Sequence, residues 1–172
     1  MAGHRFGPSL ALMVTVATAV AACPDSTWHQ EGDSCYKVFA EQTQNWPDSE
    51  EQCERWGTLV NILSSDTNRL LSGLLTASGQ SRAWIGLTNI GHADWYEWTD
   101  THRAPEFSAW GTGAPSNVSC SCGLLVGDAV WTDKWMFEQA AFICQAPADA
   151  RERSVPRDQP AARITAEGNV YC

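Results

Sequence analysis

The stretch Trp84-Ile85-Gly86-Leu87 is a short apolar run of the kind that forms a buried β-strand. After it, residues 104–118 show little regular pattern and contain much Pro, Gly and Ser, which predicts a long loop. A loop of about 15 residues inside a compact domain usually has a function. Three further strand-like runs, at 123–126, 129–131 and 141–144, complete the second half of the chain.

Two helices are predicted before this strand. The first has Asn45 as its N-cap and ends at Gly57. The second is capped by Ser64 or Ser65, carries leucines at helical spacing, and ends at Gly79. Two helices followed by short strands and a long loop indicate an α+β domain.

Composition narrows the class of protein. The 172 residues include 11 Lys and Arg against 20 Asp and Glu, for a formal net charge of −9. So acidic a chain lacks the basic footprint of a nucleic-acid-binding protein, and no nucleic-acid partner is expected. We find no nucleophile elbow, no phosphate-binding glycine loop and no Ser/His/Asp order that stands out. We therefore expect a binding protein and not an enzyme.

The start of the chain has the pattern of a signal peptide over residues 1–22. Its apolar run is shorter than the roughly 20 residues that span a bilayer. Small residues at Val20 and Ala22 precede a cut before Cys23. No other stretch is apolar enough to span, so we expect no membrane span and a secreted, extracellular chain. Val20-Ala21-Ala22-Cys23 also resembles a bacterial lipoprotein processing box, and the alternative is that Cys23 is lipidated.

The end of the chain differs in composition from the part before it. Residues 146–172 hold many Ala, Pro and Arg and almost no large apolar side chains. This pattern predicts a disordered C-terminal tail. A single domain is therefore expected over residues 23–145.

Several of these features, in this order, resemble the C-type lectin-like domain in its long form, which has an extra N-terminal hairpin. The resemblance covers nearly all of residues 23–145. It implies two helices, two small antiparallel sheets and a long loop region, stapled by Cys23–Cys35 and Cys53–Cys144 disulfides. The matching positions are Cys23, Trp28, Cys35, Cys53, Trp84, Trp95, Trp98, Asp100, Trp110 and Cys144.

The resemblance implies carbohydrate recognition, in host defence or at a cell surface, through a calcium ion held by side-chain oxygens. The family's Glu-Pro-Asn triplet, whose proline is typically cis, falls here on Ala114-Pro115-Ser116. Its Trp-Asn-Asp falls on Trp131-Thr132-Asp133. Asp133 is the one retained ligand candidate, so we expect no metal and no cofactor.

Any recognition is therefore expected not to follow the usual calcium-dependent mechanism. The partner is a glycan or, as the alternative, an extracellular protein bound through an adhesion or self-association surface. The candidate binding residues are Ser116, Asn117, Trp131, Thr132 and Asp133. Asn117-Val118-Ser119 is also an N-glycosylation sequon, and a glycan there would shield the loop.

Three cysteines, Cys120, Cys122 and Cys172, are left without an implied partner. The family's second internal disulfide cannot form, because one of its two positions is occupied by Met136. An odd number leaves at least one thiol free or bonded to another chain. Cys172 either reaches back to Cys122, forms a disulfide-linked dimer, or has no role.

Acidic residues and histidines between 92 and 102 raise the question of a zinc site. His92 and His102 flank Asp94, Glu97 and Asp100, but their spacing matches no structural zinc pattern. We therefore interpret the two histidines as exposed loop residues. The adjacent Glu50 and Glu51 are expected to lie on a solvated helix face.

Overall fold

A computed structural model describes residues 22–92 and 94–149. The segment predicted as a signal peptide lies almost wholly outside the described residues, as does Cys172 with most of the predicted tail. Within the described ranges, no helix has the length and apolar character needed to cross a membrane. The elements are β1 (His29–Glu31), β2 (Ser34–Gln44), α1 (Trp46–Cys53), β3 (Thr58–Leu59), α2 (Ser65–Ala77), β4 (Arg82–Thr88), β5 (Glu97–Trp98), β6 (Ser121–Val126), β7 (Val130–Trp135) and β8 (Ala140–Pro147).

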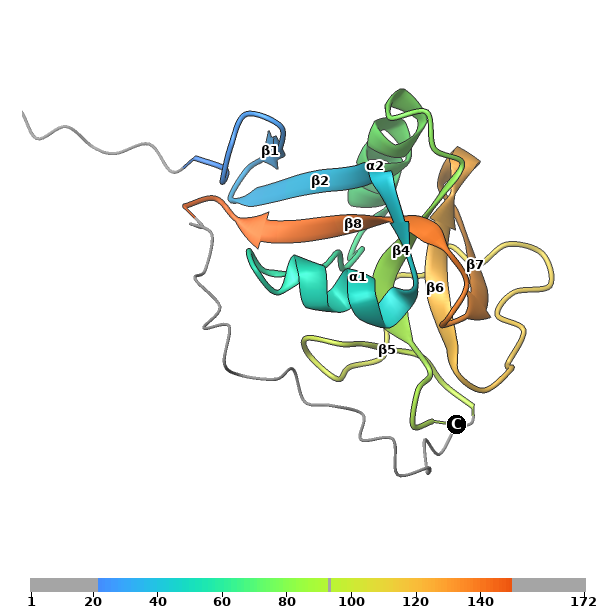
Figure 1. Ribbon diagram of the computed structural model, residues 1–172. Helices are drawn as coiled ribbons and strands as arrows, with labels where there is room; N and C mark the ends of the chain where they lie inside the picture. Colours follow the sequence, from blue (N-terminus) through green and yellow to red (C-terminus); the bar gives the residue numbers. More distant parts are fainter. Residues whose placement is uncertain (1–21, 93, 150–172) are drawn as a thin grey trace, which may run out of the picture.

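The strands form one eight-stranded sheet in the order β1-β2-β8-β4-β6-β7, with β3 added to β8 and β5 to β4. The pairing of β4 with β8 is parallel, and the other pairings are antiparallel. The parallel pair therefore joins the two small antiparallel sheets implied by the resemblance into one. In Figure 1, α2 lies above and α1 below the long β2–β8 pair, and the long loop lies beside β6 and β7.

The predicted core strand is confirmed as β4, which lies between β8 and β6. Trp84 is fully buried, and its indole nitrogen donates to the Gln44 carbonyl at 2.9 Å. Gly86 leaves room for the neighbouring chain, because a Cβ there would lie 2.9 Å from Asn61 Oδ1 and 3.0 Å from Leu59 O. Gly86 therefore lets β4 pack closely against residues 59–61, and its N–H donates to the Val60 carbonyl at 2.9 Å.

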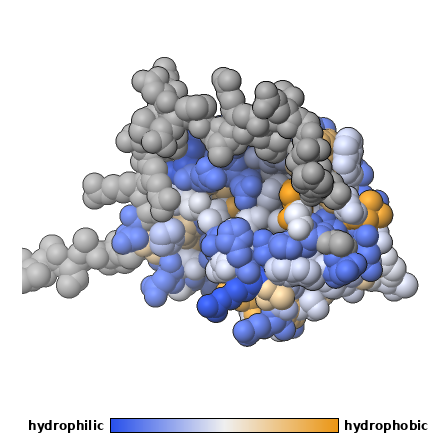
Figure 2. Space-filling view, turned by 90° about the horizontal axis from the view of Figure 1, so that it is seen from below, coloured by the Kyte–Doolittle hydropathy of each residue, from blue (hydrophilic) through white to orange (hydrophobic). Residues whose placement is uncertain are grey.

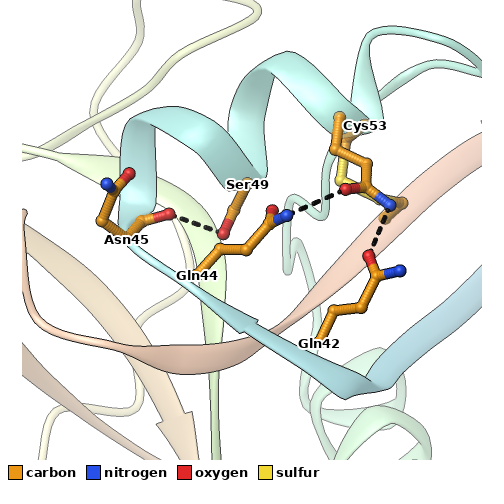
Figure 3. The surroundings of a disulfide bond; sticks show 7 residues. Gln42, Gln44, Asn45, Ser49 and Cys53 are labelled. Atoms are coloured by element: carbon orange, nitrogen blue, oxygen red, sulfur yellow. Dashed lines mark hydrogen bonds between the residues drawn. A yellow bond between two sulfur atoms is a disulfide. The ribbon is translucent and has the colours of Figure 1, made fainter.

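Two disulfides fix α1 and the N-terminal segment to the sheet, as the resemblance implies. Cys23–Cys35 joins the segment before β1 to β2, and Cys53–Cys144 joins α1 to β8. The second bond closes a separation of 91 residues, which on the chain-entropy account contributes about 4 to 5 kcal/mol. Figure 3 shows glutamines of β2, Gln42 and Gln44, beside α1 near Cys53.

The predicted helix starts are confirmed. Asn45 caps α1 by accepting from Asp48 N at 2.9 Å, and Ser64 caps α2 by accepting from Thr67 N. The prediction for the end of the first helix is wrong, since α1 ends at Cys53 and a turn carries the chain on to Gly57. At the other end of the domain, the expected boundary at 145 falls inside β8.

Gly57, in the turn after α1, lies so close to β8 that its replacement should destabilise the domain. A Cβ on Gly57 would lie 2.1 Å from the Gln145 carbonyl oxygen, so Gly57→Ala must push β3 away from β8. We expect a loss of about 2 to 3 kcal/mol in the free energy of unfolding, measured by urea denaturation.

Gly73→Ala is the matched control. Gly73 lies within α2, and a Cβ there meets nothing within 4 Å. We expect this variant to gain about 1 kcal/mol from helix propensity. Equal stability of the two variants would contradict the close packing around Gly57.

Candidate functional site

Trp131 of β7 is the centre of an aromatic cluster under the long loop. Its side chain is fully buried, and its indole nitrogen donates to Asn68 Oδ1 of α2 at 2.8 Å. Trp98, Phe107 and Trp110 meet its ring edge-on, with centroid separations of 5.8, 5.6 and 5.8 Å. The expectation that Trp131 contacts a ligand is therefore wrong, because the ring is enclosed by its own chain.

The backbone of Trp131 also holds the loop. Its N–H donates to the Ala109 carbonyl, and its carbonyl accepts from Gly111 N, both at 2.8 Å. Trp110 adds a further contact, with its ring 5.0 Å from that of Tyr96. The middle of the predicted loop therefore runs alongside β7 as a fixed segment, although it contains no regular strand.

Asp133, two residues further along β7, binds the end of the same loop. Its Oδ1 accepts from Ser116 N at 2.8 Å, and its Oδ2 accepts from the Ser116 hydroxyl and from Tyr96 Oη at 2.9 Å. Asp133 is buried. The structure thus brings Ser116 and Asp133 together, and both carboxylate oxygens are occupied by hydrogen bonds from the chain itself.

Tyr96 is suited to a donor role in this group. Burial raises the pKa of its phenol first, and the hydrogen bond to Asp133 and the charge of Asp133 raise that pKa further. The hydroxyl therefore keeps its proton through the neutral range and donates it to the carboxylate. Tyr96 was not among the predicted site residues, since no local pattern pairs it with a residue beyond the long loop.

The remaining predicted positions offer few oxygens. The Ala114–Pro115 peptide is cis, but Ala114 has no side-chain oxygen. Thr132 is half-buried, and as the neighbour of Asp133 on a strand it points to the opposite face of the sheet. Among the described residues, no three His, Cys, Asp or Glu side chains are grouped so as to hold a metal. This donor set does not fit calcium, which takes six to eight oxygens.

Asn89, which directly follows β4, joins the core strand to the end of the loop. It is buried, and its Nδ2 donates to the Val118 carbonyl at 2.8 Å. Its Oδ1 accepts from Ser121 N at 2.8 Å, and the two backbones also pair. Asn117, beside this anchor, is exposed with φ at +55°, so the sequon lies on the surface. The only sequence signal for the role of Asn89 was that an amide side chain follows the apolar run of β4 closely.

The cysteines after the loop differ from each other. Cys122 of β6 is free and buried, so the alternative in which Cys172 reaches back to it is wrong. Burial raises the pKa of its thiol, whose sulfur lies 3.3 Å from Thr88 Oγ1. Cys120 is disulfide-bonded. A neutral, enclosed thiol beside a bonded cysteine does not make a redox-active pair.

Exposed aromatic residues lie beside the loop's end, where the sequence analysis placed no site. Trp135 and Phe137, here called the aromatic tip, are 55% and 50% exposed, with their rings 5.0 Å apart. Trp135 pairs with Ser121, and the residue between the two aromatics donates its N–H to the Cys120 carbonyl. The face in Figure 2 is by contrast mainly hydrophilic, with hydrophobic residues in small separate areas.

Comparison with known proteins agrees with this architecture. The family model of the lectin C-type domain matches residues 42–146. This chain belongs to the C-type lectin domain family. A mouse relative, C-type lectin domain family 4 member A, is 31% identical over 110 residues, which cover 62% of this chain and 45% of the relative. The chain thus spans less than half of that relative's length.

Two further C-type lectins cover more of the domain. A galactose-binding isoform from Pseudechis porphyriacus is 28% identical over 155 residues, which cover 78% of this chain and 96% of the relative. The carbohydrate-recognition domain of the mouse scavenger receptor C-type lectin superposes with a TM-score of 0.66 at 27% identity. That match covers 76% of this chain and 98% of the other.

Because Tyr96 donates a hydrogen bond to Asp133, removing its hydroxyl should destabilise the domain more than removing the hydroxyl of Tyr36. Tyr96→Phe removes a donor from a buried carboxylate, and we expect it to cost about 1 to 3 kcal/mol in thermal or urea unfolding. Tyr36→Phe is the control, since Tyr36 is also buried but its hydroxyl bonds to none of the described residues. Equal losses in the two variants would contradict the role given to Tyr96.

Proposed function

We propose that this chain is a secreted C-type lectin-like protein that binds its ligand without calcium and has no catalytic role. The observation that carries this proposal is the buried Asp133 carboxylate, whose two oxygens accept from Ser116 and Tyr96. Two disulfides and the signal-peptide pattern of residues 1–22 support secretion.

Calcium would have to compete with groups that already satisfy this carboxylate. An ion at Asp133 must displace hydrogen bonds from a backbone N–H and two hydroxyls. In return it gains one carboxylate, because Ala114, Ser116 and Thr132 stand where the family has its other ligands. Without the ion, chelation of a sugar diol has no physical basis, so the ligand must be bound by direct contacts.

The aromatic tip favours a protein as that ligand. Large aromatic side chains exposed next to a fixed backbone are typical of the residues that dominate protein–protein binding energy. Trp135 is paired with Ser121 of β6 and packs on Phe137, which limits the entropy lost when a partner covers the two rings. A glycan on the exposed sequon at Asn117 would shield the neighbouring loop and leave the tip as the accessible surface.

A glycan ligand is the second candidate. The Pseudechis relative, which aligns over most of this chain, is described as galactose-binding. In this chain a sugar would have to stack on Trp135 or another exposed aromatic ring and form direct hydrogen bonds. Like the first candidate, this mode needs no calcium.

Addition of calcium tests the absence of a calcium site. A site filled to about 100 times its dissociation constant would stabilise the domain by about 2.7 kcal/mol. We expect the melting temperature of the native chain to be the same in millimolar calcium and in excess chelator. The triple variant Ala114→Glu, Ser116→Asn, Thr132→Asn restores family ligands and is the control expected to respond. Stabilisation of the native chain by calcium would contradict the proposal.

Screening on arrays of extracellular proteins and of glycans, with and without chelator, tests the ligand class. We expect protein binding that chelator leaves unchanged and that Trp135→Ala or Phe137→Ala weakens at least tenfold, about 1.4 kcal/mol. Leu63→Ala is the control, because Leu63 is 68% exposed and lies outside the aromatic tip. Glycan binding alone would favour the second candidate, and binding lost in chelator would contradict both.

A further inference from the structure

A buried glutamate on β5 lies between two histidines. Glu97 Oε2 is 3.3 Å from His92 Nε2, and Glu97 Oε1 is 3.0 Å from His102 Nδ1. The Glu97 side chain is only 10% exposed, whereas those of His92 and His102 are 29% and 75% exposed. The description of His92 as an exposed loop residue is therefore wrong, since its ring is enclosed on one side by the carboxylate.

Each histidine belongs to a turn that flanks β5. His92 donates its N–H to the Asn89 carbonyl at 2.9 Å, and its ring lies 4.0 Å from that of Trp95. His102 has φ at +53° and donates its N–H to the Trp98 carbonyl at 2.8 Å. Glu97 thus connects the turn before β5 with the turn after it.

The contacts do not form a metal site. The two imidazole nitrogens meet different oxygens of one carboxylate. Among residues 22–92 and 94–149, no three His, Cys, Asp or Glu side chains are grouped so as to hold a metal ion. The arrangement is a pair of hydrogen-bonded contacts whose strength depends on the charge of each imidazole.

We propose that His92, Glu97 and His102 form a clamp that tightens on acidification and loosens at neutral pH. A neutral imidazole makes one ordinary hydrogen bond to Glu97, whereas an imidazolium adds an ion pair with a carboxylate largely removed from water. The added stabilisation is present where the two imidazoles are charged and is lost where they are neutral. Because His92 packs on the exposed Trp95, the clamp also orders that ring.

Other titratable groups lie near the clamp, both on its own segment and on a neighbouring helix. Its own segment carries Asp94, Asp100 and Arg103, of which Asp100 accepts a hydrogen bond from Asn61. From α1 comes Glu50, which is partly buried and not on a solvated face as expected. Burial raises the pKa of Glu50, while Thr99 and then His102 lower it, and Glu54 adds to the rise.

Glu50 therefore needs its own control. A carboxyl whose folded-state pKa is raised stabilises the chain more at low pH than at high pH, the same sign as the clamp. Cys122 of β6 lies near Glu50, but its thiol stays neutral because burial raises its pKa. Glu50→Gln separates the contribution of Glu50 from that of the histidines.

Amide hydrogen exchange tests the clamp on the full chain. We expect protection of residues 97–103, corrected for intrinsic exchange, to be roughly tenfold higher at about pH 5.5 than at about pH 7.5. His92→Gln and His102→Gln should each reduce this ratio, and Glu97→Gln should bring it close to one. His29→Gln, on β1, and Glu50→Gln should leave most of it.

Two results would overturn the clamp. The first is a native chain whose corrected protection of residues 97–103 does not change between the two pH values. The second is a pH dependence that survives both histidine substitutions together or disappears in Glu50→Gln alone. His102 is largely exposed, so His102→Gln keeps the test decisive even if Glu97→Gln does not fold.

Discussion

Strand β7 holds the irregular half of this domain in place. Trp131 closes the aromatic cluster, bonds to α2 through Asn68, and pairs its backbone with the middle of the long loop. Asp133 then fixes the end of the loop through Ser116 and Tyr96. Asp133, the residue that a calcium ion would need, thus already accepts hydrogen bonds from other parts of the folded chain. The same hydrogen bonds from Ser116 and Tyr96 hold the end of the loop against β7.

Features that depend on nearby residues could be predicted from the sequence. The caps at Asn45 and Ser64 were correct because a side-chain oxygen two or three residues from an unpaired N–H is a local property. The buried strand around Trp84 was correct because an apolar run of this length has few other uses. The disulfides at Cys53 and Cys23 followed from the family resemblance and not from the residues alone.

Features that depend on distant residues could not be predicted. The sequence left Asp133 as a surviving ligand, but its three donors come from loops far away in the chain. Trp131 was named as a candidate binding residue because its motif belongs to the family's site, yet its ring is fully buried. Glu50 was expected on a solvated helix face, and only packing distinguishes it from an exposed carboxylate. Alternation along β7 also fails to predict the exposure of Trp135, which lies two residues after the buried Asp133 on the same face of the strand.

The most direct test of the account is anomalous diffraction from crystals grown in millimolar calcium or soaked with a lanthanide. The account predicts unchanged hydrogen bonds from Ser116 and Tyr96 to Asp133, with no anomalous peak beside that carboxylate. A peak there, surrounded by six or more oxygens with Ser116 and Tyr96 turned away, would contradict it.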